Sequence, residues 1–199
     1  MTKVKLCGLT RECDIEAVNE LKPEYIGFVF AKKSKRYVSP EKAQMLKNLL
    51  NKDIQAVGVF VNEDIQEVAK LLNNNIIDLA QLHGNENEEY IKSLRNLTNR
   101  KIIKAFKITG EEDIKKAEQS SADFVLLDSG AGTGQTFNWS LIKNINREYF
   151  LAGGLSPDNE IEAIETLHPY ALDVSSGIET DGFKDKDKMT KFVNLRKDV

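Results

Sequence analysis

Several features of well-known protein classes are missing from this sequence. None of its apolar runs approaches the roughly 20 residues needed to span a bilayer. The N-terminus is charged and then strand-like, without the apolar segment of a secretory signal. Two cysteines, Cys7 and Cys13, are too few for a disulfide framework and lack zinc-ligand spacing. We therefore expect a globular, cytoplasmic protein.

Strong charge of either sign is also absent. The 28 basic and 31 acidic residues give a formal net charge of −3. So small a total gives no electrostatic reason to expect nucleic acid or a membrane surface as partner. No exposed apolar stripe stands out, so we expect a monomer.

What the sequence does contain is an alternation of two kinds of segment. Eight apolar runs of four to eight residues have the continuous character of strands buried on both faces. They are residues 4–7, 25–30, 55–61, 77–82, 102–106, 124–128, 149–152 and 171–174. Helical spacing of apolar residues follows at 40–50, 64–72, 88–97, 111–118, 159–167 and 186–195. Ser39 followed by Pro40 is typical of a helix start.

Eight such units in 199 residues leave roughly 25 residues for each, which suits a βα repeat. The pattern predicts one domain spanning residues 1–199, an α/β fold of the (β/α)8 TIM barrel type. A doubly wound open sheet is the alternative, but no G-x-G-x-x-G follows the first strand.

Glycines and polar residues gather where the predicted strands end, which is the catalytic rim of a barrel. Gly153 and Gly154 follow the seventh strand, and Ser175, Ser176 and Gly177 follow the eighth. Loops at these two places often bind phosphate through backbone amides. Although glycine in one loop can simply permit a tight turn, two such loops at the expected places predict a phosphate site. The stretch 131–134 resembles part of a phosphate loop but lacks its lysine, and we interpret it as a mobile cover.

Cys7 and Asp128 end the first and sixth predicted strands and form a candidate acid–base pair. A lone cysteine is usually a small core residue, and a lone aspartate after a strand usually a turn residue. At neutral pH an unperturbed thiol is mostly protonated and an unperturbed carboxyl ionised. A basic thiol and an acidic carboxyl would each therefore work in a minority state or with a shifted pKa.

Three further residues are candidates for substrate binding. Arg36 can grip a carboxylate with two hydrogen bonds, although the lysines around it also fit a solvated basic loop. Gln81 and His83 point to one side of their strand, and a hydrogen-bonded structural role is the alternative for the histidine. We interpret Cys13, Trp139 and His168 as structural, and the charged segment from Lys184 as a solvated helix face.

Seven blocks in order closely resemble the phosphoribosylanthranilate isomerase family. They are residues 5–10, 27–30 with 34–38, 57–62, 81–84, 127–129 with 132–134 and Phe137, 151–155 and 173–179. Three positions depart from the family's pattern, namely Lys35, Ala131 and Asn138, where proline, glycine and aspartate are expected. None of the three removes a proposed chemical group.

This resemblance implies a (β/α)8 barrel that needs no cofactor and carries out an Amadori rearrangement in tryptophan biosynthesis. Asp128 would be the general acid that opens the ribose ring, and Cys7 the general base at the sugar's C2. Arg36 would hold the anthranilate carboxylate and the glycine and serine loops the phosphate.

Two other readings stay open. The first alternative is another phosphosugar barrel enzyme. A histidine-pathway isomerase, which is one such enzyme, should have aspartate rather than cysteine at position 7. A metal-dependent pentose-phosphate epimerase should have several rim histidines, and this chain has two histidines in all. A non-catalytic phosphosugar-binding barrel is the other, because its loops would look the same.

Overall fold

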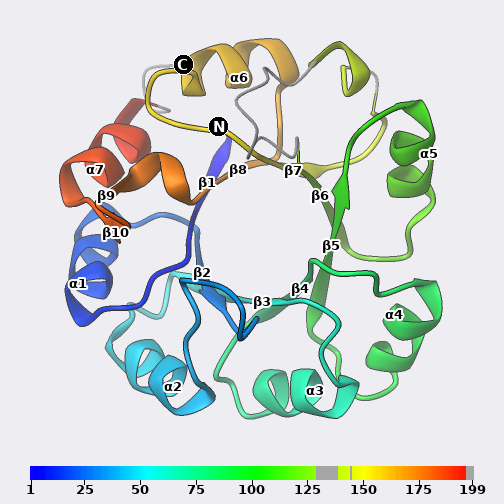
Figure 1. The fold of residues 1–199 in the computed structure, drawn as a ribbon, viewed down its shortest axis with the longest axis horizontal. Helices are drawn as coiled ribbons and strands as arrows, with labels where there is room; N and C mark the ends of the chain where they lie inside the picture. The colour runs from blue at the N-terminus through cyan, green and yellow to red at the C-terminus, as the bar shows by residue number, and fades with distance from the viewer. Residues whose placement is uncertain (129–138, 144, 196–199) are drawn as a thin grey trace.

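The chain folds as a closed barrel of eight parallel strands, each hydrogen-bonded to the next, with the eighth paired to the first. This is a computed structural model, and it describes residues 1–128, 139–143 and 145–195. Viewed along the barrel axis, the strands form an inner ring and the helices an outer one (Figure 1). The (β/α)8 barrel predicted from the sequence is therefore confirmed.

The strands lie close to their predicted positions. They are β1 (Lys3–Cys7), β2 (Tyr25–Val29), β3 (Gln55–Phe60), β4 (Leu79–Leu82), β5 (Lys101–Lys107), β6 (Phe124–Asp128), β7 (Tyr149–Ala152) and β8 (Ala171–Val174). A short antiparallel pair, β9 (Glu179–Thr180) and β10 (Phe183–Lys184), follows β8 and was not predicted.

In the part of the chain that the structure describes, seven helices surround the barrel. They are α1 (Glu12–Leu21), α2 (Pro40–Leu49), α3 (Ile65–Asn73), α4 (Glu88–Arg95), α5 (Glu111–Gln119), α6 (Glu160–Leu167) and α7 (Lys186–Leu195). Ser39 caps α2 as predicted, since its hydroxyl accepts from the Lys42 N–H at 3.2 Å. In the described residues between β6 and β7, the chain forms a 3-10 turn (Trp139–Leu141). The predicted cover at 131–134 lies outside the described residues.

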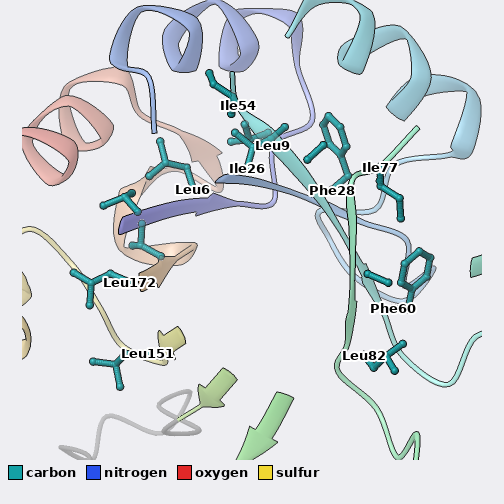
Figure 2. Close-up of a cluster of buried hydrophobic side chains, with 14 of the residues drawn as sticks. Leu6, Leu9, Ile26, Phe28, Ile54, Phe60, Ile77, Leu82, Leu151 and Leu172 are labelled. Atoms are coloured by element: carbon teal, nitrogen blue, oxygen red, sulfur yellow. The ribbon is translucent and has the colours of Figure 1, made fainter. Parts of the chain in front are cut away.

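Alternation along each strand divides the apolar residues into two layers. Val4 and Leu6 of β1 face the helices, in the large cluster shown in part in Figure 2. Leu126 and Phe150 belong to a second cluster inside the barrel. Burial on both sides explains why the strands read as continuous apolar runs.

The segment from Lys184 corrects one expectation. Lys184 is not part of a solvated helix face: it lies in β10 and its side chain is 2% exposed. Helix α7 begins at Lys186 and buries Met189, Phe192 and Val193. Cys13, interpreted as structural, is exposed on α1, and both cysteines are free thiols. Across the described residues, none of the helices has the length and apolar character to cross a membrane.

Candidate active site at the carboxyl ends of the strands

A cavity of about 390 Å³ opens at the carboxyl ends of the strands. Most of the predicted site residues line it: Cys7, Gln81, His83, Asp128, Gly153, Gly154, Ser175 and Ser176. Val59, Ala152, Leu155 and Asp173 complete the lining. The end-of-strand positions were enough to bring predicted residues from five different strands or their loops to one place.

Cys7 ends β1 and points into the barrel, where Gly27 of β2 leaves room for it. The two residues are paired in the parallel ladder, and a methyl group on Gly27 would lie 2.5 Å from the Cys7 Sγ. Lys5, two residues earlier, points the same way and donates to Sγ at 3.3 Å. The thiol therefore sits in a pocket that β1 and β2 shape together.

Lys5 is a buried ammonium that sequence reasoning overlooked. Its side chain is 0% exposed, and besides Cys7 it bonds the Asp173 Oδ2 on β8 at 2.7 Å. Burial alone would lower the pKa of Lys5, but Asp173 and Cys7 together raise it above its ordinary value. A charged residue inside an apolar strand, at an inward position, was the signal that could have revealed both Lys5 and Asp173.

The Cys7 thiol experiences two opposing influences. Burial raises its pKa above the ordinary value, because it disfavours the thiolate. The Lys5 ammonium opposes this rise, as does Lys184 from further away. The thiol can thus serve as a base whose charged form is held by a fixed cation.

Asp128 stands at the end of β6 beside His83. The His83 Nε2 lies 3.3 Å from the Asp128 Oδ2, and the His83 Nδ1 lies 2.8 Å from the Gln81 Nε2. Because an amide nitrogen can only donate, Nδ1 is the acceptor and the ring proton of neutral His83 is on Nε2, facing the carboxyl. Gln81 and His83 therefore act as a connected pair that orients Asp128.

The loops after β7 and β8 form the other wall. Gly153 and Gly154 have φ of 93° and 68°, a backbone conformation that suits glycine. Gly177 packs its backbone on this loop so tightly that a Cβ would lie 1.9 Å from the Leu155 oxygen. The two predicted phosphate loops are thus in direct contact.

Arg36 lies at the edge of this wall and is already engaged. Its Nε and Nη2 donate to the two carboxylate oxygens of Glu179 at 2.6 and 2.7 Å. Lys184 also donates to Glu179, at 2.6 Å, and to the Ser175 carbonyl at 2.9 Å. Burial favours a higher pKa for Glu179, but these two cations hold it below its ordinary value. Glu179 and Lys184 thus support Arg36 and Ser175 from outside the cavity lining, and the sequence did not reveal these contacts.

A thiol, a carboxyl and two glycine loops in mutual contact surround one cavity at the catalytic rim of the closed parallel barrel. These features are those of a (β/α)8 barrel enzyme with a polar site that can bind an anion.

Comparison with known proteins narrows this class. Residues 4–195 match the family model described as N-(5'phosphoribosyl)anthranilate (PRA) isomerase. The chain is 48% identical over 202 residues to N-(5'-phosphoribosyl)anthranilate isomerase of Clostridium acetobutylicum, with 97% of each covered. It also resembles the phosphoribosyl anthranilate isomerase structure from Thermotoga maritima, at 36% identity, full coverage of both chains and a TM-score of 0.90.

A further solved phosphoribosyl anthranilate isomerase, in complex with reduced 1-(o-carboxyphenylamino)-1-deoxyribulose 5-phosphate, is 35% identical over the whole of both chains, with a TM-score of 0.88. The chain belongs to the N-(5'-phosphoribosyl)anthranilate isomerase family, whose place is in tryptophan biosynthesis. The family resemblance seen in the sequence is therefore confirmed, and the chain is an isomerase enzyme.

Proposed function

We propose that the chain converts N-(5-phosphoribosyl)anthranilate to 1-(2-carboxyphenylamino)-1-deoxyribulose 5-phosphate with Asp128 as general acid and Cys7 as general base. One observation carries the assignment of roles: the thiol and the carboxyl line the same cavity from β1 and β6. An aldose-to-ketose shift needs one acid and one base at different atoms of one sugar. The rearrangement proceeds through the substrate's own imine.

The first step is ring opening. Asp128 in its protonated form gives its proton to the ribose ring oxygen while the bond from that oxygen to C1 breaks. The nitrogen lone pair forms the C1–N double bond, which gives a protonated imine. His83, 3.3 Å from Asp128, then donates to the carboxylate that remains.

In the second step the Cys7 thiolate takes the proton from C2. The electrons of that C–H bond form the C1–C2 double bond, and those of the imine return to nitrogen, which gives an enolamine. Loss of the C2 hydroxyl proton and protonation at C1 then complete the ketone. Lys5, at 3.3 Å from Sγ, favours the thiolate that starts this step.

The remaining groups bind the two ends of the substrate. The amides of Gly153, Gly154, Ser176 and Gly177 are suited to hold the phosphate, with the Ser175 hydroxyl beside them. Arg36 is suited to hold the anthranilate carboxylate, because its pairing with Glu179 presents a fixed guanidinium at the edge of the site.

Two substitutions and a matched control test these roles. Cys7→Ala and Asp128→Asn should each lower kcat by about 100- to 10,000-fold, the usual contribution of a positioned acid or base. Cys13→Ala removes the exposed cysteine on α1 and should leave kcat unchanged. Each variant is also titrated with the reduced product, reduced 1-(o-carboxyphenylamino)-1-deoxyribulose 5-phosphate, and should still bind it. Near-native turnover by Cys7→Ala or Asp128→Asn would contradict the roles, and binding without turnover by the native protein would support a non-catalytic barrel.

We further propose that the enzyme acts as a cytoplasmic monomer on a phosphosugar and has neither nucleic acid nor membrane as partner. The small net charge and the free cysteines support this assignment. A solved relative from Thermotoga maritima is described as dimeric, so the oligomeric state deserves its own measurement. Sedimentation at micromolar concentration should give the mass of one chain, and cell fractionation should recover the protein with cytoplasmic markers.

A further inference from the structure

Asp173 presents an unpaired carboxylate oxygen to the catalytic cavity. Its side chain is 7% exposed, and its Oδ2 is fixed by the Lys5 ammonium at 2.7 Å. Its Oδ1 is buried and has no hydrogen-bond partner among the residues that the structure describes. Asp173 also lines the cavity. Because leaving a buried acceptor unsatisfied is costly, this oxygen points to a donor that arrives with the ligand.

Gln81 repeats the arrangement on β4. The residue is 1% exposed, its Nε2 is used by His83, and within the described part of the chain its Oε1 lacks a hydrogen-bond partner. The cavity floor thus carries two buried acceptor oxygens. Neighbouring hydroxyl groups on a sugar are donors of matching chemistry, whereas a phosphate or a carboxylate would be repelled by Asp173.

The position of Asp173 selects one hydroxyl. Lys5 Nζ bonds both the Asp173 Oδ2 and the Cys7 Sγ, so the carboxylate lies beside the thiol. In the proposed reaction that thiol meets the hydrogen on C2. The hydroxyl on the same carbon is therefore the sugar donor that comes nearest to Asp173. Gln81 lines the same cavity and bonds His83, and the hydroxyl that neighbours the one on C2 is the hydroxyl on C3.

We propose that the Asp173 Oδ1 accepts a hydrogen bond from the sugar's C2 hydroxyl and that the Gln81 Oε1 accepts one from the C3 hydroxyl. This inference rests on the proposed function, because the placement of C2 comes from the role of Cys7. It makes Asp173 a specificity-determining residue: a ligand without the C2 hydroxyl leaves a buried carboxylate oxygen unpaired.

A cycle of two ligands and two proteins tests the contact with Asp173. The reduced product, which carries a C2 hydroxyl, and its 2-deoxy counterpart are titrated by calorimetry into the native protein and into Asp173→Asn. Asparagine keeps an acceptor for Lys5 and turns an amide donor toward the cavity. The native protein should bind the 2-deoxy ligand about 10- to 100-fold more weakly, the range for a hydrogen bond to a charged group. In Asp173→Asn this preference should fall to less than about threefold.

Asp78→Asn is the matched control. Asp78 precedes β4 at the opposite end of the barrel, where it pairs with Lys47 and accepts from the Ala56 N–H. This variant loses one partner of a lysine–aspartate pair but should keep the native preference for the C2 hydroxyl. Equal binding of both ligands by native protein, or an undiminished preference in Asp173→Asn, would overturn the inference.

Two further measurements keep the inference separate from folding and from the proposed function. If Asp173→Asn does not fold, the native protein is compared on 2-deoxy and 4-deoxy ligands, and the 2-deoxy ligand should bind more weakly of the two. Equal loss for both ligands would contradict the role of Asp173. Turnover of phosphoribosylanthranilate by the native protein is measured in parallel. Turnover without the ligand preference refutes the Asp173 contact alone, whereas absence of turnover refutes the proposed function.

Discussion

Gly27 on β2 gives the sharpest test of how the thiol is positioned. An added methyl group would lie 2.5 Å from the Cys7 Sγ and 3.2 Å from its Cβ. Comfortable separation between such atoms is about 3.5–4.0 Å, so Gly27→Ala forces the thiol to move by about 1 Å. The strand pairing between the two residues leaves the side chain, rather than the backbone, to make most of that movement.

The expected consequences can be stated as magnitudes. A displacement of about 1 Å at a reacting group can cost about 100-fold in rate, so kcat/KM should fall by that order. Overpacking typically costs about 1–3 kcal/mol, so the free energy of unfolding should fall by a similar amount. The protein should therefore remain folded while losing most of its activity.

Gly58 on β3 provides a control of the same kind. A methyl group there would lie 2.5 Å from the Ile77 Cδ1 and 2.9 Å from the Phe60 ring, in the layer between strands and helices. Gly58→Ala should lose comparable stability in urea unfolding but keep kcat/KM within about threefold. Native activity in Gly27→Ala, or an equal loss of activity in Gly58→Ala, would refute the idea that glycine at position 27 places the thiol.

Two further predictions concern charge. Burial raises the pKa of the Cys7 thiol, so kcat/KM should increase with pH in the alkaline range, above about 8.5. Lys5→Met removes the ammonium that opposes this rise, so the increase of kcat/KM with pH should begin at a higher pH. An increase at the same pH as in the native protein would exclude the role of Lys5 in favouring the thiolate. Glu179→Ala leaves the buried Lys184 and Arg36 without their shared partner and should cost about 3 kcal/mol of unfolding free energy. Folding lowers the pKa of Glu179, so the ionised carboxylate stabilises the folded protein fully at pH values above the unfolded-state pKa of about 4.3. This stabilisation is lost as the pH falls through the lower pKa of the folded state. The difference between native and variant in urea unfolding should therefore shrink at pH 3.

The barrel and most of the site could be predicted because both depend on local pattern. Strands buried on both faces produce apolar runs that are visible without any knowledge of neighbours. Parallel strands in a barrel place their carboxyl ends at one rim, so Cys7 and Asp128 could be brought together from strand order alone. The same rule located the glycine and serine loops that line the cavity.

The buried ionic contacts could not be predicted because they join residues far apart in the sequence. Lys5 and Asp173 are paired through the closure of β1 on β8. Arg36, in the loop after β2, meets Glu179 of β9, which follows β8. Lys184 looked like one more charge in a polar segment, since nothing local shows that Ser175 and Glu179 surround its ammonium. Such contacts follow from the closed topology rather than from residue type.

We expect this chain to perform the isomerisation without any other protein. The direct measurement is to incubate the purified protein with freshly prepared N-(5-phosphoribosyl)anthranilate and to follow the ketose product by chromatography. We expect conversion far faster than in the absence of protein, with each chain turning over many substrate molecules. Binding of the substrate with no product above the uncatalysed level would show that the chain is not an isomerase.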